Sequence, residues 1–196
     1  MLKLVFATNN LNKIKEVHRL LHGSINLMCL NDILCLEELP ETSATIKENA
    51  IQKAKYVYEK YGYNCFADDT GLEIAALNGE PGVFSARYAG DERNNEKNIA
   101  KVLLNLATKT NRVALFKTVI ALIIDGEITC FEGIILGEIT HLKKGKEGFG
   151  YDSIFMPSGQ TKTFAEMSLS KKNKISHRSI ALTKLVEYLN KNLISN

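Results

Sequence analysis

The sequence contains no tryptophan and only 3 prolines among its 196 residues. It has no run of five or more like charges and a formal net charge of only +3, so we expect no dedicated nucleic-acid-binding surface. No apolar stretch approaches the length of a membrane span, so we expect no membrane partner. The apolar start, Leu2 to Ala7, is too short for the apolar core of a signal peptide.

The cysteines also lack a pattern that would give them a role. The four of them (Cys29, Cys35, Cys65 and Cys130) form no C-x-x-C pair and no metal-ligand spacing. Two lie within strand-like apolar runs. We therefore expect four reduced thiols in a cytoplasmic protein.

The composition that remains is that of an ordinary globular protein, with 45% apolar and 24% charged residues. The length suits one domain covering residues 1–196, and no repeat or linker divides it. Apolar runs predict strands at Lys3–Ala7, Ile25–Leu30, Cys65–Ala67 and Leu72–Leu77. The dipeptide Asp125-Gly126 predicts a hairpin between Val113–Ile124 and Glu127–Ile135.

Four segments have helical spacing. They are Asn12–Leu21, capped by Asn12, with Ile14, Val17, Leu20 and Leu21 on one face, and Thr45–Tyr61, Asn94–Leu106 and Ser176–Leu193. Strands interleaved with helices, together with one long hairpin, indicate an α/β fold with a mixed sheet.

Two adjacent carboxylates, Asp68 and Asp69, follow the short apolar strand and are the most informative feature of the chain. Thr70-Gly71 is typical of a turn that ends this strand. Because successive strand residues point to opposite faces, one carboxylate should enter a site while the other braces the turn. The alternative is a turn with two solvated aspartates, which are common turn formers.

Two further segments suit a phosphate and a metal ion. Thr8–Lys13 joins a strand to a helix, where amide groups and the helix dipole favour an anion, although an ordinary polar cap has the same pattern. The P-loop spacing is absent. Glu41, in an irregular loop around Pro40, could reach Asp69, and two such carboxylates suit Mg²⁺.

The later part of the chain carries an aromatic, glycine-containing segment, Gly148–Asp152, which allows a flat ligand to approach the backbone or simply forms a turn with core aromatics. His177 and Arg178 start the last helix, where their charges oppose the helix dipole unless a ligand needs their donors. The cluster Lys171-Lys172-Asn173-Lys174 is suited to one polyphosphate.

Six motifs in this order resemble the inosine triphosphate pyrophosphatase family, and the resemblance covers essentially the whole chain. The motifs are Thr8–Lys13, Glu48-Asn49-Ala50, Ala67–Leu72, Pro81–Tyr88, Phe149–Asp152 and Ser176-His177-Arg178. The resemblance implies an elongated mixed α/β fold with two lobes around a central nucleotide cleft, usually a homodimer. It also implies Mg²⁺-dependent hydrolysis of ITP, dITP or XTP to the monophosphate and pyrophosphate.

The resemblance also implies a role for each matched residue. Asp69 would accept the proton of the attacking water, supported by Asp68, and would bind Mg²⁺ together with Glu41. The residues expected to bind substrate are Thr8, Asn9, Asn10, Leu11, Asn12, Lys13, Lys53 and Thr70 around the phosphates and Phe149, Gly150, Tyr151, Asp152, Lys172, His177 and Arg178 around the nucleoside.

Three positions depart from the family pattern: Asn9 and Ser43 stand where glycine is common, and Thr70 stands where serine is common. Thr70 keeps the hydroxyl, and asparagine tolerates a positive φ better than most residues. Two alternatives remain at this point. One is a pyrophosphatase of the related septum-inhibitor (Maf-like) family, and the other is a nucleotide-binding module without catalysis.

Overall fold

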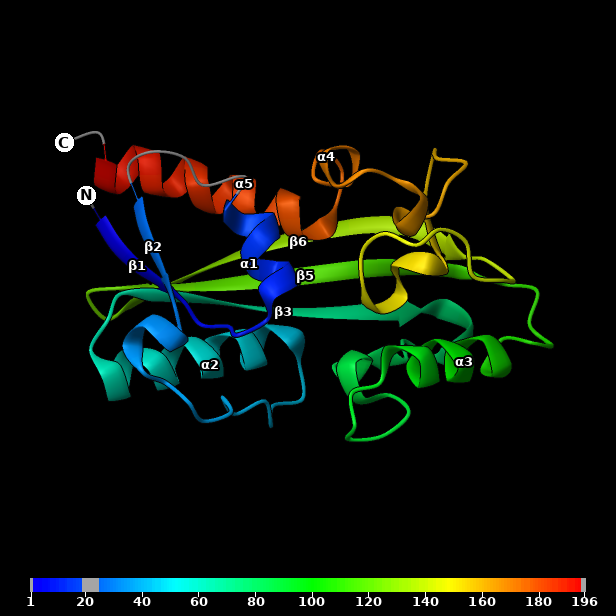
Figure 1. The fold of residues 1–196 in the computed structure, drawn as a ribbon, viewed down its shortest axis with the longest axis horizontal. Coiled ribbons are helices and arrows are strands. Elements are labelled where there is room, and N and C mark those ends of the chain that lie inside the picture. Colours follow the sequence, from blue (N-terminus) through cyan, green and yellow to red (C-terminus); the bar gives the residue numbers. More distant parts are fainter. Residues whose placement is uncertain (1, 19–24, 195–196) are drawn as a thin grey trace. The chain divides into compact units, whose positions relative to one another are not determined.

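A computed structural model describes residues 2–18 and 25–194 (Figure 1). The strands are β1 Leu2–Phe6, β2 Ile25–Cys29, β3 Cys65–Ile74, β4 Pro81–Gly82, β5 Val113–Ile124, β6 Glu127–Ile139 and β7 Phe155–Pro157. The α-helices are α1 Leu11–His18, α2 Ile46–Tyr61, α3 Asn95–Asn105, α4 Leu169–Lys172 and α5 His177–Leu189, which continues as a π-helical turn, Asn190–Ile194. Short 3-10 turns occur at Asn31–Ile33, Ala75–Leu77, Ser85–Arg87, Gly150–Ser153 and Phe164–Glu166.

The strand order is β2-β1-β3-β5-β6-β7, with β4 beside β3. β1 pairs in parallel with β2 and β3, whereas β3–β4 and β6–β7 are antiparallel pairs. The sheet is therefore mixed and flanked by helices, which confirms the predicted α/β class.

The chain forms two compact units. The first unit contains Met1–Asp69, Thr118–Gly133 and Arg178–Asn196, and the second contains Thr70–Lys117 and Ile134–His177. The chain passes from one unit to the other between Asp69 and Thr70 and again between His177 and Arg178. Both points fall inside motifs that the family resemblance rests on.

In the first unit, helices α5 and α2 lie on opposite sides of β1 and β3 (Figure 1). Leu4 and Phe6 of β1 share a buried cluster with Phe66 of β3, and the Phe6 and Phe66 rings stack 4.5 Å apart. This cluster includes the α5 residues Ala181, Leu182, Leu185 and Leu189. The alternate residue Cys65 faces α2, because its thiol donates to the Ala54 carbonyl at 3.2 Å. Strand alternation thus gives β3 one side toward α5 and one toward α2.

The helix ends of the first unit follow from their capping residues. The Thr45 side chain accepts the Glu48 N–H at 3.1 Å, and Gly62 ends α2 with φ of 71°, so this helix is confirmed. The predicted Asn12 cap of α1 is wrong, because the Asn10 side chain accepts the N–H groups of Asn12 and Lys13 and the helix starts at Leu11. Of the predicted apolar face, Leu20 and Leu21 lie outside the described residues, whereas Val17 is buried.

The predicted turn at Thr70-Gly71 is also wrong. Strand β3 runs through these residues to Ile74, and only Ala75–Leu77 of the expected separate strand leaves the extended conformation. Leu72 and Ile74 are fully buried in the core of the second unit, and the Leu72 N–H donates to the Ser85 hydroxyl at 2.9 Å. Burial of these two side chains therefore overrides the local turn preference of Thr-Gly.

The hairpin predicted around Asp125-Gly126 is confirmed. Both turn residues have positive φ, 49° and 86°, as two-residue hairpin turns require. The second strand is longer than expected and extends to Ile139, whose side chain is buried in the second unit.

In the second unit, α3 and α4 lie on opposite sides of the strands (Figure 1). The predicted inward-facing residues Ile99, Val102 and Leu106 are buried, whereas Leu103 is half-buried. They share a cluster with the aromatic residues Phe116, Tyr151, Phe155 and Phe164. Among the described residues, no helix has both the length and the apolar character needed to cross a membrane. All four cysteines are free, as expected.

Candidate active site

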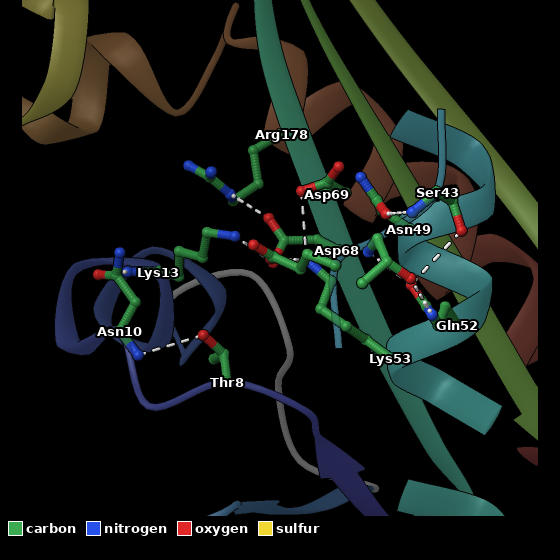
Figure 2. A network of polar contacts seen from close by, with 12 residues as sticks. Thr8, Asn10, Lys13, Ser43, Asn49, Gln52, Lys53, Asp68, Asp69 and Arg178 are labelled. Atoms are coloured by element: carbon green, nitrogen blue, oxygen red, sulfur yellow. Dashed lines mark hydrogen bonds and ion pairs between the residues drawn. The ribbon is translucent and has the colours of Figure 1, made fainter. Parts of the chain in front are cut away.

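The two carboxylates of β3 point to opposite sides of the strand (Figure 2). Asp68 shares the side of Phe66 and meets Arg178 of α5 and Lys13 of α1. Asp69 shares the side of Cys65 and meets Lys53 of α2. The alternation expected from the sequence is therefore present, but neither carboxylate braces a turn.

Asp68 is held between two cations. Its side chain is only 2% exposed, and it accepts hydrogen bonds from Lys13 Nζ at 2.8 Å and from Arg178 Nε at 3.2 Å. Burial alone would raise the pKa of Asp68, but the charges of Lys13 and Arg178 outweigh it and hold the pKa below the ordinary 3.8. Asp68 is therefore ionised near neutral pH, and it holds the side chains of Lys13 and Arg178 in place.

Asp69 and Glu41 share one lysine. The buried Lys53 ammonium donates to Glu41 Oε1 at 2.7 Å and to Asp69 Oδ1 at 3.2 Å. Burial raises the pKa of Asp69 although Lys53 opposes this shift. The second oxygen, Asp69 Oδ2, is buried and has no hydrogen-bond partner among the described residues. An orphaned acceptor of this kind is costly unless something binds it.

The loop Thr8–Lys13 lies beside Asp68, which Lys13 contacts, and is shaped by its own side chains (Figure 2). The Thr8 hydroxyl accepts the Asn10 N–H at 3.1 Å, while Asn9, Leu11 and Asn12 are exposed. Asn9 is not among the described residues with positive φ, so the departure from glycine needs no special tolerance. The Asn10 cap occupies the first amides of α1, so a phosphate there would compete with this side chain.

A second polar set lies within the second unit. Asp152 accepts the Phe149 N–H at 2.9 Å and pairs with Lys172 Nζ at 2.8 Å, and both charged side chains are almost fully buried. The Lys172 ammonium also lies 5.0 Å from the centroid of the Phe149 ring and 5.6 Å from that of Phe164. Gly148 is required here, because a Cβ would lie 2.1 Å from Asp152 Oδ2.

The other predicted nucleoside residues have different surroundings. Tyr151 is buried and its hydroxyl donates to the Ser85 carbonyl at 2.8 Å. His177 is also buried, and its ring stacks on Phe116 with centroids 4.5 Å apart. Gly150 has a positive φ of 57°. Thr70 is half-buried in the part of β3 that belongs to the second unit.

Arg178, expected around the nucleoside, belongs to the first unit and contacts Asp68, next to Lys13. Within the basic cluster Lys171-Lys172-Asn173-Lys174, Lys172 is the buried member, whereas Lys171 and Lys174 are exposed. Sequence reasoning missed the ion pairs of Asp68 and Asp152, because their partners are distant along the chain. Phe164 was also missed, since no motif marks it.

The donor set around Asp69 fits Mg²⁺. Mg²⁺ takes oxygen ligands, and proteins commonly hold it with one or two carboxylates while it keeps waters and substrate phosphates. Glu41 and Asp69 supply two carboxylates, and Asp69 Oδ2 is the orphaned oxygen. Groups of three or more histidine, cysteine, aspartate or glutamate side chains suited to a metal are absent from the described part of the chain. Two carboxylates would leave most of the coordination positions of Mg²⁺ to water or phosphate oxygens.

Comparisons with known proteins identify the family of this chain. The model of the Ham1 family matches residues 4–188. A protein named dITP/XTP pyrophosphatase from Christiangramia forsetii is 56% identical over 97% of this chain and 100% of its own length. A protein of the same name from Porphyromonas gingivalis is 48% identical over 96% of this chain and 98% of its own length.

Solved structures of Ham1 proteins have the same fold as this chain. A HAM1 protein from Coxiella burnetii superimposes with a TM-score of 0.90 at 40% identity, covering 97% of this chain and 100% of that one. The Staphylococcus aureus Ham1 protein superimposes with a TM-score of 0.89 at 38% identity, covering 96% of this chain and 98% of that one.

Proposed function

Because this chain belongs to the Ham1 family, we propose that it is a nucleoside triphosphate pyrophosphatase that hydrolyses non-canonical purine nucleotides. Its substrates would be dITP, XTP and ITP, and its products the nucleoside monophosphate and pyrophosphate. The names of relatives that are 42–56% identical over nearly the whole chain support this substrate class. The observation that carries the proposal is the arrangement of Asp68 and Asp69 among three cations in the first unit.

Phosphate binding is the first task of these residues. A triphosphate is strongly anionic, and Lys13, Lys53 and Arg178 offer three cations that are already held in place by carboxylates. Cations that are fixed before the reaction stabilise developing charge without reorganisation. The Thr8–Lys13 loop and Thr70 would add polar contacts to the phosphates.

Activation of the attacking water is the task proposed for Asp69. Its Oδ2 has no hydrogen-bond partner among the described residues, and burial raises its pKa. Both features suit an oxygen that orients a water and accepts its proton. Asp68 keeps Lys13 and Arg178 in place beside it. Glu41 and Asp69 would hold Mg²⁺, which when bound neutralises phosphate charge.

Base recognition is the task proposed for the second unit. The Phe149 ring is suited to stacking on a purine, and the buried Asp152–Lys172 pair fixes the turn that carries this ring. Tyr151 and His177, whose rings are packed in the core, would contribute through this packing, Tyr151 by its bond to the Ser85 carbonyl and His177 by its stacking on Phe116.

The cellular setting and the assembly complete the proposal. The four free thiols suit a reducing compartment, so we place the enzyme in the cytoplasm. The resemblance to the inosine triphosphate pyrophosphatase family supports a homodimer. Light scattering of the purified protein measures this directly, and a monomeric mass at micromolar concentration would contradict it.

A pyrophosphate-release assay with ITP, XTP, dITP, ATP and GTP tests the proposed activity. We expect release from the first three substrates, loss of activity in excess EDTA, recovery on adding Mg²⁺ and no change on thiol reduction. The variant Asp69→Asn, purified in parallel, reports any contaminating phosphatase. Tight nucleotide binding without release would indicate a binding module instead, and a preference for other bases would indicate a Maf-like activity.

A further inference from the structure

Glu41 lies in a segment without regular secondary structure. Between the 3-10 turn Asn31–Ile33 and helix α2, residues 35–45 form neither helix nor strand. A metal ligand on such a segment needs other groups to hold it, because ligand side chains must be fixed to bind a small cation well. Helix α2 supplies the groups that hold this one.

Two amide side chains of α2 bind the peptide groups directly after Glu41 (Figure 2). Gln52 Oε1 accepts the Thr42 N–H at 3.0 Å, and Gln52 Nε2 donates to the Thr42 hydroxyl at 2.8 Å. Asn49 Oδ1 accepts the Ser43 N–H at 2.8 Å. The Ser43 hydroxyl, present where the related family commonly has glycine, donates to Gln52 Oε1 at 3.4 Å.

The start of the same segment is held by Glu37. Its Oε1 accepts hydrogen bonds from the hydroxyls of Tyr56 at 3.0 Å and Tyr61 at 2.7 Å, and from Lys60 Nζ at 2.5 Å. Asn49, Gln52, Lys53, Tyr56 and Lys60 are spaced three, one, three and four residues apart, which places them along one face of α2. A single helix face therefore holds the segment before and after Glu41 and, through Lys53, the Glu41 carboxylate itself.

The contact between Gln52 and Thr42 lies outside the buried core. Thr42 is exposed and Gln52 only half-buried, whereas the buried residues of α2 are Ile46, Asn49, Ala50, Lys53, Ala54 and Val57. Gln52 neighbours Lys53 in sequence, and its bonding partner Thr42 neighbours Glu41. Its bidentate contact thus ties the backbone of the metal-binding segment to the helix that carries Lys53.

We propose that Gln52 is a positioning residue for the metal site, holding Glu41 where it can act with Asp69 through the bidentate contact with Thr42. The inference rests on the proposed function, because it assigns to Glu41 the role of metal ligand. Loss of such a supporting contact commonly lowers metal affinity or activity by about 10- to 100-fold. Since Glu41 keeps its carboxylate, excess metal should restore the rate.

The test compares Gln52→Met, Thr42→Val and the double variant with the wild-type protein. Methionine matches glutamine in length and in helix propensity, so α2 is preserved. Gln160→Met, a substitution of the same type in the second unit, is the matched control. For each protein we would measure kcat for dITP and the Mg²⁺ concentration at half-maximal rate, together with Mn²⁺ binding by electron paramagnetic resonance without nucleotide.

We expect Gln52→Met to raise the half-maximal Mg²⁺ concentration and the Mn²⁺ dissociation constant about 10-fold, with kcat at saturating Mg²⁺ within about twofold of the wild type. The double variant should add little to Gln52→Met, because Gln52→Met already breaks the one bond that Thr42→Val removes. Unchanged metal dependence in Gln52→Met would overturn the inference, as would a fall in kcat that saturating metal does not restore. If Gln52→Met does not fold, Thr42→Val, at an exposed position, removes the bond from Gln52 Nε2 to the Thr42 hydroxyl but keeps the bond from the Thr42 N–H to Gln52 Oε1. It should therefore shift the metal dependence in the same direction by a smaller amount, and an unchanged metal dependence would overturn the inference.

The two proposals fail in different ways. If the wild-type protein releases no pyrophosphate from any purine nucleotide, the proposed function fails. The Mn²⁺ measurement then still decides whether Gln52 controls metal binding at Glu41. If the wild-type protein is active and the Gln52 variant keeps the wild-type metal dependence, only the positioning role fails.

Discussion

The two polar sets of the candidate site, each within its own unit, contain different kinds of side chain. The set in the first unit combines the carboxylates Glu41, Asp68 and Asp69 with the cations Lys13, Lys53 and Arg178. The set in the second unit has one ion pair, Asp152–Lys172, beside the rings of Phe149 and Phe164. Dense charge suits phosphate chemistry, whereas an aromatic ring beside one fixed ion pair suits recognition of a flat base.

The aspartates of the two sets also differ in their hydrogen bonding. In the second unit, the Asp152 carboxylate is occupied by Lys172 and by the Phe149 N–H. In the first unit, Asp69 keeps one buried oxygen without a hydrogen-bond partner among the described residues. An unsatisfied group of this kind is typical of reactive sites. Changes in the first set should therefore lower kcat, and changes in the second should raise KM or alter base choice.

The sharpest way to break this comparison is Asp69→Asn. The neutral amide keeps the shape of the side chain but cannot accept the proton of the attacking water, so kcat should fall about 100-fold or more. Thermal unfolding should remain cooperative and close to the wild type. Steady-state rates at saturating Mg²⁺ measure the effect, with Asp91→Asn at an exposed site as the control. A variant that keeps more than a tenth of the wild-type rate contradicts the assignment.

Base discrimination by the wild-type protein tests the second set. Hypoxanthine and xanthine present a 6-keto acceptor, whereas adenine presents a 6-amino donor, which a donor-lined pocket leaves unpaired. Such mismatches cost much in kcat/KM, and we expect ITP and XTP to exceed ATP by about 100-fold or more. Competition between ITP and ATP in one reaction measures this ratio directly. Similar values of kcat/KM for ATP and ITP would contradict the proposed base pocket but not the proposed pyrophosphatase activity.

Removal of the aromatic ring in Phe149→Ala should have a smaller effect, and on the other kinetic constant. Loss of base stacking commonly costs about 1–3 kcal/mol, so KM for dITP should rise about 10-fold while kcat changes little. The control is Phe84→Ala, an exposed phenylalanine of the same unit. If kcat falls and KM stays constant, the proposed division of labour between the two sets is wrong.

The smallest effect is expected at Glu37, which lies outside both sets but holds the segment carrying Glu41. The hydrogen bonds from Lys60 and Tyr61 lower the pKa of Glu37 from 4.5 to about 2. The ionised carboxylate therefore stabilises the fold fully above about pH 4.5, and this stabilisation is lost as the pH falls from 4.5 toward 2.

The change Glu37→Gln removes this charge, so the variant should melt slightly below the wild type at about pH 7, and the difference should shrink by about pH 3. Exposed contacts are screened, so the shift in Tm should be small. Thermal scans across this pH range measure it. The control Glu92→Gln breaks another exposed ion pair, the one with Lys97, and shows how much the loss of such a pair alone changes Tm. A difference in Tm between Glu37→Gln and the wild type that grows at low pH would contradict this prediction.

Local patterns were sufficient to predict most of the elements. The helix predicted over Thr45–Tyr61 followed from its helical spacing, and the hairpin followed from Asp125-Gly126. These predictions succeeded because helical periodicity and tight turns depend on residues within a few positions. The prediction at Thr70-Gly71 failed because the burial of Leu72 and Ile74 depends on packing partners that no local window contains.

The sequence by itself determined the family and the α/β class, and it predicted the site residues, since all three follow from motif order and local periodicity. Only the tertiary structure decided what each site residue contacts. Asp68 binds Lys13, 55 positions away, and Arg178, 110 positions away, while its neighbour Asp69 faces another helix. Likewise, Lys172 is buried against Asp152, 20 positions away, although its neighbour Lys171 is exposed. Ion pairs of this kind form between residues far apart in the chain, so the spacing of charges along the sequence does not reveal them.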